Sequence, residues 1–154
     1  MKRRVLKYLV LISFLVLFLS TISSLFVYYN NYSKVEQENL FKMCHILKIG
    51  ADREEDKLSY LEELSKNTKS FRISLIDKNG QVLFDTYENP KFLPTHKDRP
   101  EFQNAKKFGF AQSKRFSTTL STDSYYVSFL LNNDQVLRLS KEVDSIMGAF
   151  LKIL

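Results

Sequence analysis

Cysteine, histidine and glycine are scarce in this chain, and their scarcity argues against several kinds of site. Cys44 is the single cysteine among 154 residues, so no disulfide can form within the chain. His45 and the adjacent Cys44 point to different faces of a helix, and no ligand-spaced acidic residue accompanies His96. With four glycines, the sequence contains no G-x-x-x-x-G-K-S/T phosphate loop, and it has neither a G-x-S-x-G nor an H-E-x-x-H motif. We therefore predict no metal site, no cofactor and no catalytic centre.

Positive charge is concentrated at the N-terminus. The formal net charge is +6, but Lys2, Arg3, Arg4 and Lys7 are four of the 23 basic residues, and the other 19 are set against all 17 acidic ones. A nucleic-acid-binding domain would instead gather its lysine and arginine on one folded face. The charge pattern therefore predicts a membrane-topology signal and no nucleic-acid partner.

Residues 8–29, YLVLISFLVLFLSTISSLFVYY, contain no charged side chain. As a helix this run extends about 33 Å, enough to cross a hydrocarbon core of about 30 Å. The basic tail at residues 1–7 predicts a cytoplasmic N-terminus, with the rest of the chain outside. A cleaved signal peptide is the alternative, but the run outlasts an h-region of about 7–15 residues and lacks an A-x-A-like cleavage site. We expect a retained, single-pass anchor in the lipid bilayer.

A charged segment with one apolar stripe follows the span, over residues 30–67. The stripe repeats at spacings of four and three residues, which predicts a long amphipathic helix. Its members are Leu40, Cys44, Leu47, Ala51, Leu58 and Leu61. Glu54 interrupts the pattern, so we expect the helix to pack on the following domain more than to form a coiled coil. The open alternative is a dimer in which Cys44 meets its symmetry mate.

Strand patterns occupy residues 68–142. In SFRISLIDKNGQVLFDT, apolar residues alternate on both sides of Asn79-Gly80, which predicts a hairpin with a type I′ turn. SYYVSFLL and QVLRLS flank Asn132-Asn133-Asp134 and predict a second hairpin, while residues 114–120 predict a fifth strand. We expect one five-stranded, mostly antiparallel sheet.

The segment THKDRPEFQNAKKFG predicts a short helix that bridges the two hairpins. Asp98 and Glu101 have capping-box spacing, Pro100 is tolerated in a first turn, and Gly109 is placed to end the helix. The resulting order is long helix, two strands, short helix and three strands. This α+β order is that of an extracytoplasmic PAS-like or single-Cache sensor domain.

Four segments, RISLIDKNGQVLFDT, HKDRPEFQNAKKFG, RFSTTLSTDSYYVSFLL and VLRLSKEV, resemble in order and spacing the sensor region of phosphate-regulon and related cell-wall-type bacterial sensor histidine kinases. The resemblance implies a bacterial cell membrane, a PAS-like outer domain, a second membrane helix and a cytoplasmic transmitter. Neither histidine lies in a phosphoacceptor box, and the ATP-binding boxes are missing, so we expect no kinase activity from this chain. Residues 143–154 resemble the approach to the second membrane helix, which predicts truncation before the transmitter.

Arg99 is the leading candidate for ligand binding. A guanidinium at a helix start can hold a carboxylate or phosphate with paired hydrogen bonds, and the helix N-terminus adds a favourable field. Other residues expected to complete a pocket under the short helix are Arg115, Tyr125, Tyr126 and Arg138. In the structural alternative, Arg99 pairs with Glu101 or a loop carbonyl, and the tyrosines pack across strands.

These observations predict a membrane-anchored extracytoplasmic sensor module, the input half of a two-component histidine kinase. Its expected partners are the lipid bilayer, a second copy or a partner histidine kinase, and a small anionic or envelope ligand. The alternative is a complete, stand-alone binding protein that docks on a partner kinase or on envelope polymer. An exported enzyme is disfavoured because no catalytic motif is present.

Overall fold

The computed structural model describes residues 2–66, 68, 70–117 and 122–142. The chain divides into two compact units, one that includes Met1–Val35 and a second, Glu36–Val143, that contains the sheet. The predicted C-terminal approach to a membrane helix, residues 143–154, lies outside the described residues.

Helix α1, Lys2–Arg53, is assigned as one helix of 52 residues. It is long and apolar enough to cross a membrane, and the 18-residue window that meets this test is exposed throughout. The helix expected over residues 30–67 is two helices, because α1 ends at Arg53 and α2 covers Lys57–Lys66. Asp56 starts α2: its Oδ1 accepts the N–H groups of Leu58 and Ser59, at 3.1 and 3.2 Å. A side-chain cap of this kind favours a new helix start over continuation of the old one.

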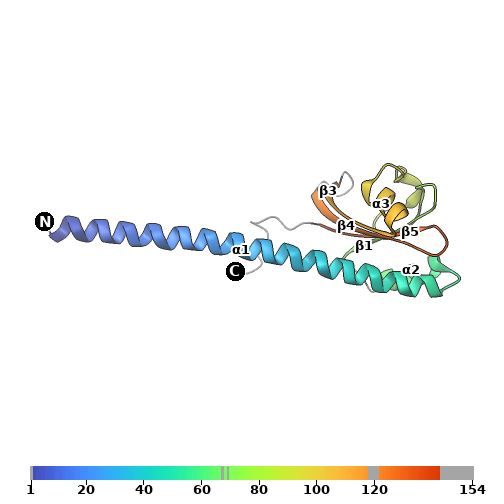
Figure 1. Ribbon diagram of the computed structural model, residues 1–154, viewed down its shortest axis with the longest axis horizontal. Coiled ribbons are helices and arrows are strands. Elements are labelled where there is room, and N and C mark those ends of the chain that lie inside the picture. The colour runs from blue at the N-terminus through green and yellow to red at the C-terminus, as the bar shows by residue number, and fades with distance from the viewer. Residues whose placement is uncertain (1, 67, 69, 118–121, 143–154) are drawn as a thin grey trace. The chain divides into compact units, whose positions relative to one another are not determined.

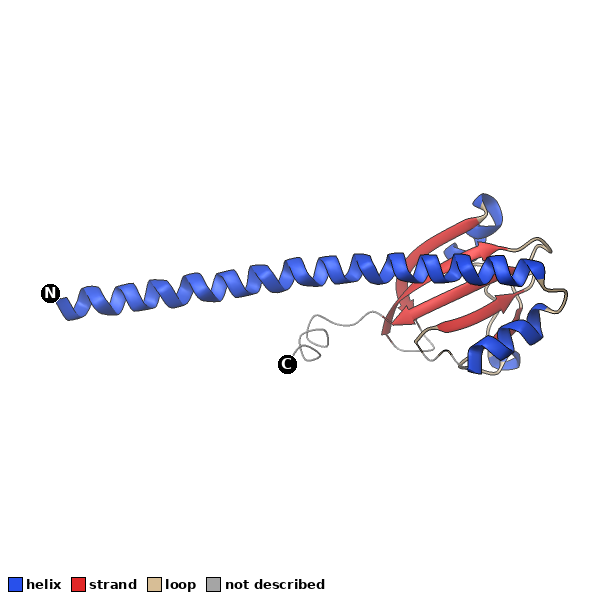
Figure 2. Cartoon of the chain, turned by 90° about the horizontal axis from the view of Figure 1, so that it is seen from below, coloured by secondary structure: helices blue, strands red, loops and turns tan. Residues whose placement is uncertain are grey.

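The second unit is built on a five-stranded antiparallel sheet with strand order β2-β1-β5-β4-β3, which confirms the expected α+β class. The strands are β1 Arg72–Ile76, β2 Val82–Asp85, β3 Phe110–Ser117, β4 Thr122–Leu130 and β5 Val136–Glu142. A short 3-10 helix, η1 Pro90–Phe92, and helix α3, Pro100–Phe108, lie between β2 and β3. Within this unit α1 covers one face of the sheet and α3 covers the other (Figures 1 and 2).

Both expected hairpins form, but the first turn differs from type I′. That type needs positive φ at two central residues, whereas here Gly80 has φ 92° and Asn79 is not in the positive region. The Asp77 carboxylate organises a longer loop instead, accepting the N–H groups of Asn79 and Gln81 at 2.9 and 2.7 Å. In the second hairpin, the positive φ of 65° falls on Asp134.

The apolar core of the unit lies on the α1 face of the sheet. Leu40, Cys44, Leu47 and Ala51 of α1 are buried there, as predicted from their spacing. They pack against the inward side chains of the central strands: Ile73, Leu75, Val127, Phe129, Leu137 and Leu139. Each buried leucine, isoleucine or phenylalanine contributes about 1.5–3 kcal/mol. Leu58 is 40% exposed because the break before α2 removes it from the stripe.

Polar contacts fasten both ends of this stretch of α1 to the strands. At its C-terminal end, Asp52 Oδ1 accepts the backbone N–H of Asn132 at 2.9 Å, and the Asn132 amide donates to the Asp52 carbonyl at 2.9 Å. Near residue 36, the Glu36 carboxylate pairs with Lys141 of β5. The helix is therefore tied to the β4–β5 turn and to β5 itself.

Cys44 lies inside the core and is shielded from a second chain. Its side chain is fully buried, its thiol donates to the Val127 carbonyl at 3.6 Å, and burial raises the thiol pKa. We expect mild oxidant to leave the full chain monomeric on non-reducing gels, and alkylation of the native thiol to be slow, with rapid alkylation in urea as the control. An oxidised dimer that Cys44→Ser abolishes would contradict this packing.

Candidate functional site

Helix α3 holds the carboxylate around which the polar face of the sheet is organised. Arg99 is the N-cap residue and makes no side-chain cap, so the capping box expected from Asp98 and Glu101 is wrong. The Glu101 side chain turns into the sheet instead of back to the helix start. Pro100 at the first helical position and Gly109 at φ 85° delimit the helix as predicted.

Glu101 is fully buried between two arginines from different strands. Its Oε1 accepts from Arg115 Nη2 at 2.9 Å and from Arg138 Nη1 at 3.4 Å. Its Oε2 accepts from Ser113 Oγ at 3.3 Å and from Arg115 Nε at 3.4 Å. These contacts join α3 to β3 and β5.

Tyr126 lies between the same two arginines. The Arg115 guanidinium is 4.2 Å from the centroid of its ring, and that of Arg138 is 5.4 Å away. Buried cation–π contacts of this kind are worth about 0.5–2 kcal/mol. The fold thus brings together three of the predicted site residues, Arg115, Tyr126 and Arg138, around one carboxylate.

A second ion pair extends the network to the other edge of the sheet. Arg72 Nε donates to both carboxylate oxygens of Asp85, at 2.9 and 2.8 Å. Ser74 Oγ donates to Asp85 at 2.8 Å and accepts from Arg138 Nη2 at 3.0 Å. Polar groups therefore run without interruption from Asp85 to Glu101 beneath α3.

The electrostatics of this face favour negative charge. Burial alone would raise the pKa of Glu101, but the hydrogen bond from Arg115 and the charge of Arg138 lower it overall. Burial lowers the pKa of Arg138 to about 10, despite the attraction of Glu101. Three buried or half-buried arginines face two carboxylates, and Arg138 Nε has no hydrogen-bond partner among the described residues.

Arg99, the leading candidate from the sequence, stays outside this network. It is half-buried at the start of α3, and its side chain makes no hydrogen bond or ion pair with another described residue. The alternative pairing with Glu101 does not form, because Arg115 and Arg138 occupy that carboxylate.

Sequence reasoning missed Glu101, Arg72 and Asp85 as members of the site. The signal was present in the strands, where Arg72 and Ser74 alternate with apolar residues as a second, polar face requires. Such alternation ordinarily indicates a solvent-facing side. Here α3 and the segment after β2, in which Tyr87 lies against Arg72, bury the face.

Comparison with known proteins supports the fold and gives no family assignment. No family model and no curated protein matches the chain. The Bacillus subtilis YkuI protein, solved with an EAL domain and in complex with c-di-GMP and calcium, matches with a TM-score of 0.53 and 16% identity over 75% of this chain and 35% of that one. The extracellular domain of the histidine kinase candidate rpHK1S-Z16 matches with a TM-score of 0.48 and 16% identity over 58% of this chain and 39% of that one. The matches thus span little more than a third of either solved chain.

Removing the shared carboxylate should destabilise the second unit strongly. Glu101→Ala leaves Arg115 and Arg138 without their buried counter-charge, which typically costs about 3–5 kcal/mol. Arg99→Ala is the matched control on the same helix and should change stability by about 0.5 kcal/mol or less. Urea unfolding of the full chain in detergent micelles measures both. A greater loss from Arg99→Ala than from Glu101→Ala would contradict the network.

His96 should make stability depend on pH. Its side chain is buried before α3, and burial, aided by the Arg138 charge, lowers its pKa from 6.5 to about 4. Folded His96 therefore stays neutral to a lower pH than His96 in the unfolded chain. Its contribution to the free energy of unfolding is complete above pH 6.5 and is lost as the pH falls towards 4. Between pH 6.5 and 5, we expect a loss of about 1 kcal/mol per pH unit, because the unfolded chain takes up only part of a proton more than the folded one there. His96→Gln should flatten the profile in that range, and an unchanged slope would contradict the assignment.

Proposed function

We propose that this chain is a membrane-anchored extracytoplasmic sensor module, the input part of a two-component histidine kinase. The observation that carries the proposal is the course of α1. One helix, Lys2–Arg53, contains both the candidate membrane span and the residues that pack into the core of the sheet unit. A sensor needs such a physical connection between what it detects and the membrane.

Strand β5 offers a route from the polar face to α1. Arg138 faces α3 and contacts Glu101, while the adjacent Leu137 and Leu139 pack in the core that includes α1. A change in the charge network that favours one position of β5 would thus bias the packing of α1. In this proposal the sheet carries the signal between its two faces.

The ligand class proposed for the polar face is a small anion, from solution or from an envelope component. The support is the surplus of arginine donors over carboxylate acceptors, together with the unpartnered Arg138 Nε. Such an anion would compete with Glu101 for Arg115 and Arg138. The module would act by binding and not by catalysis, with a second copy or a partner kinase receiving the signal.

A chimera tests this proposal. Residues 1–142, joined through a second membrane helix to the transmitter of a bacterial histidine kinase, should give a kinase whose autophosphorylation depends on the outer unit. Glu101→Gln should shift the autophosphorylation level by about fivefold or more, the lower end of typical coupling between sites. Lys78→Gln, in the exposed β1–β2 turn, should leave it unchanged.

A phosphatase reporter fused after Asp134 checks in parallel that the sheet unit is exported. Equal autophosphorylation of the parent and Glu101→Gln chimeras, with the reporter active outside, would refute signalling through the network. That result would favour the stand-alone binding protein.

A further inference from the structure

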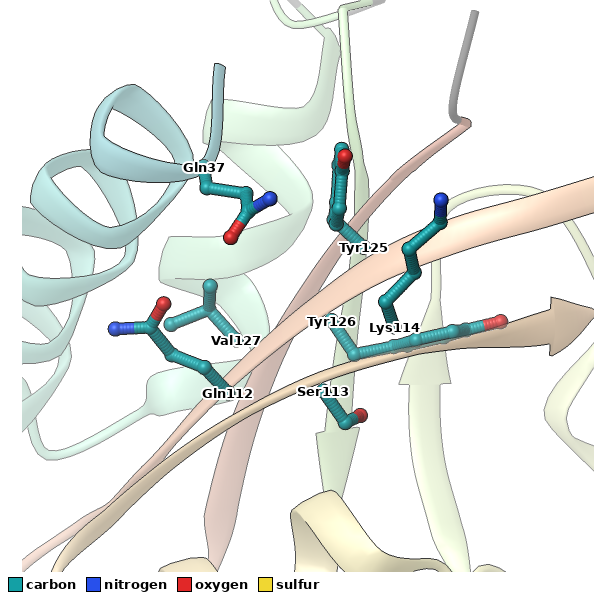
Figure 3. A pocket seen from close by; sticks show the side chains of 7 residues that line it. All are labelled: Gln37, Gln112, Ser113, Lys114, Tyr125, Tyr126 and Val127. Atoms are coloured by element: carbon teal, nitrogen blue, oxygen red, sulfur yellow. The ribbon is translucent and has the colours of Figure 1, made fainter. Parts of the chain in front are cut away.

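A cavity of about 180 Å³ lies on the other side of the sheet from Glu101, between α1 and strands β3 and β4. Its lining comprises Gln37 of α1 with Gln112, Ser113, Lys114, Tyr125, Tyr126 and Val127. Figure 3 shows Gln37 reaching from the helix towards Gln112 and Val127, while Ser113 points the other way.

α1 meets the edge strand at Phe110, where the ring of Phe41 lies 5.8 Å away, and the cavity lies further along β3, at Gln112 and Lys114. The core beneath α1 is made by β1, β4 and β5, and β3 contributes none of its buried members. On the α1 side of β3, Gln112 and Lys114 stand opposite Val127 and Tyr125 of β4. Val127 and Tyr125 are buried and form an apolar floor, whereas Gln112 and Lys114 form an exposed rim.

The polar groups of the cavity have spare bonding capacity. Neither the Gln37 nor the Gln112 side-chain amide makes a hydrogen bond to another described residue, and each amide offers donors and an acceptor. The Lys114 ammonium lies 5.7 Å from the centroid of the Tyr125 ring and forms no ion pair with a described residue. The nearby Lys141 is already neutralised by Glu36.

We propose that this cavity binds a small hydroxylated carboxylate, a hydroxy acid or a uronic acid. The carboxylate pairs with Lys114, and hydroxyl groups bond to the amides of Gln37 and Gln112. A volume of about 180 Å³ accommodates a single small acid or sugar. No carboxylate lines the cavity within the described chain, so an amino acid would find no counter-charge for its ammonium group.

A ligand held there would connect α1 directly to the edge strand. Gln37 lies one residue after Glu36, whose pairing with Lys141 already fastens α1 to β5. The ligand would add an attachment to β3 at the same level of the helix. This site is separate from the arginine network, and binding to it does not require the signalling role proposed above.

Titration of the full chain in detergent micelles with D-glucuronate and D-glycerate, followed by calorimetry and ligand-observed NMR, tests the proposal. We expect saturable binding, with D-glucose much weaker because it lacks the carboxylate. Lys114→Gln and Gln37→Leu should each weaken binding by about tenfold, which corresponds to about 1.4 kcal/mol. Lys114→Arg should retain most of the affinity, and Lys78→Gln, a surface lysine distant in sequence, should retain all of it.

Three results would overturn the proposal. These are absence of binding by both acids to the parent chain, equal affinity in the folded Lys114→Gln variant, and loss of binding in a folded Glu101→Gln variant. The last would assign the ligand to the arginine network on the opposite face. Failure of the kinase chimera would leave these binding results unaffected, so the two proposals fail separately.

Discussion

The packing of α1 on the apolar face of the sheet is the contact on which the rest of the structure depends. Leu40, Cys44, Leu47 and Ala51 bury one side of the helix against the central strands, and Asp52 closes the contact at the β4–β5 turn. A two-sided sheet of this size needs such a cover, because its inward apolar side chains would otherwise face water. The same helix is the one that carries the candidate membrane span.

The opposite face combines ion pairs with a smaller apolar cluster, in which Phe102 and Ala105 of α3 pack with Ile76, Ala111 and Val136 of the strands. Replacing a buried ion pair by well-packed apolar residues is often neutral for stability, so Glu101 and its arginines are weak evidence of a stability device. What they provide is position, because Glu101 accepts from β3 and β5 at once and thereby fixes where α3 lies. A contact of this kind depends on charge, whereas the packing of α1 depends on the burial of apolar surface.

The elements whose signals are local could be predicted from the sequence. The apolar run, the alternating strands and the α3 boundaries at Pro100 and Gly109 all follow from neighbouring residues. The break before α2 was missed because the cap at Asp56 competes with an otherwise continuous helical pattern. The cap at Asp56 stabilises a new helix start, and the apolar stripe, already interrupted at Glu54, does little to favour continuation of the first helix.

Only part of the polar site beneath α3 could be predicted, because its contacts join residues that lie far apart in the sequence. Arg115, Tyr126 and Arg138 were expected under the short helix and lie there, whereas Tyr125, expected with them, packs in the core on the opposite face. Glu101 was assigned to its own helix start. Its partners lie 14 and 37 residues away in the sequence, and the charge attraction of the buried Arg138 and the half-buried Arg115 exceeds that of one exposed backbone N–H. Long-range pairing of this kind leaves no local pattern. Arg99 was overestimated for the same reason, since a helix-start position says nothing about which strands face it.

Helix α1 runs without a break from the candidate membrane span to the residues buried in the core of the sheet unit. Amide hydrogen exchange of the full chain in lipid nanodiscs tests this continuity most directly. We expect protection throughout α1, including residues 30–36 between the candidate span and the packed stripe, with fast exchange resuming only at Glu54–Asp56. Rapid exchange at residues 30–36 would show a flexible joint there, and it would contradict transmission through α1.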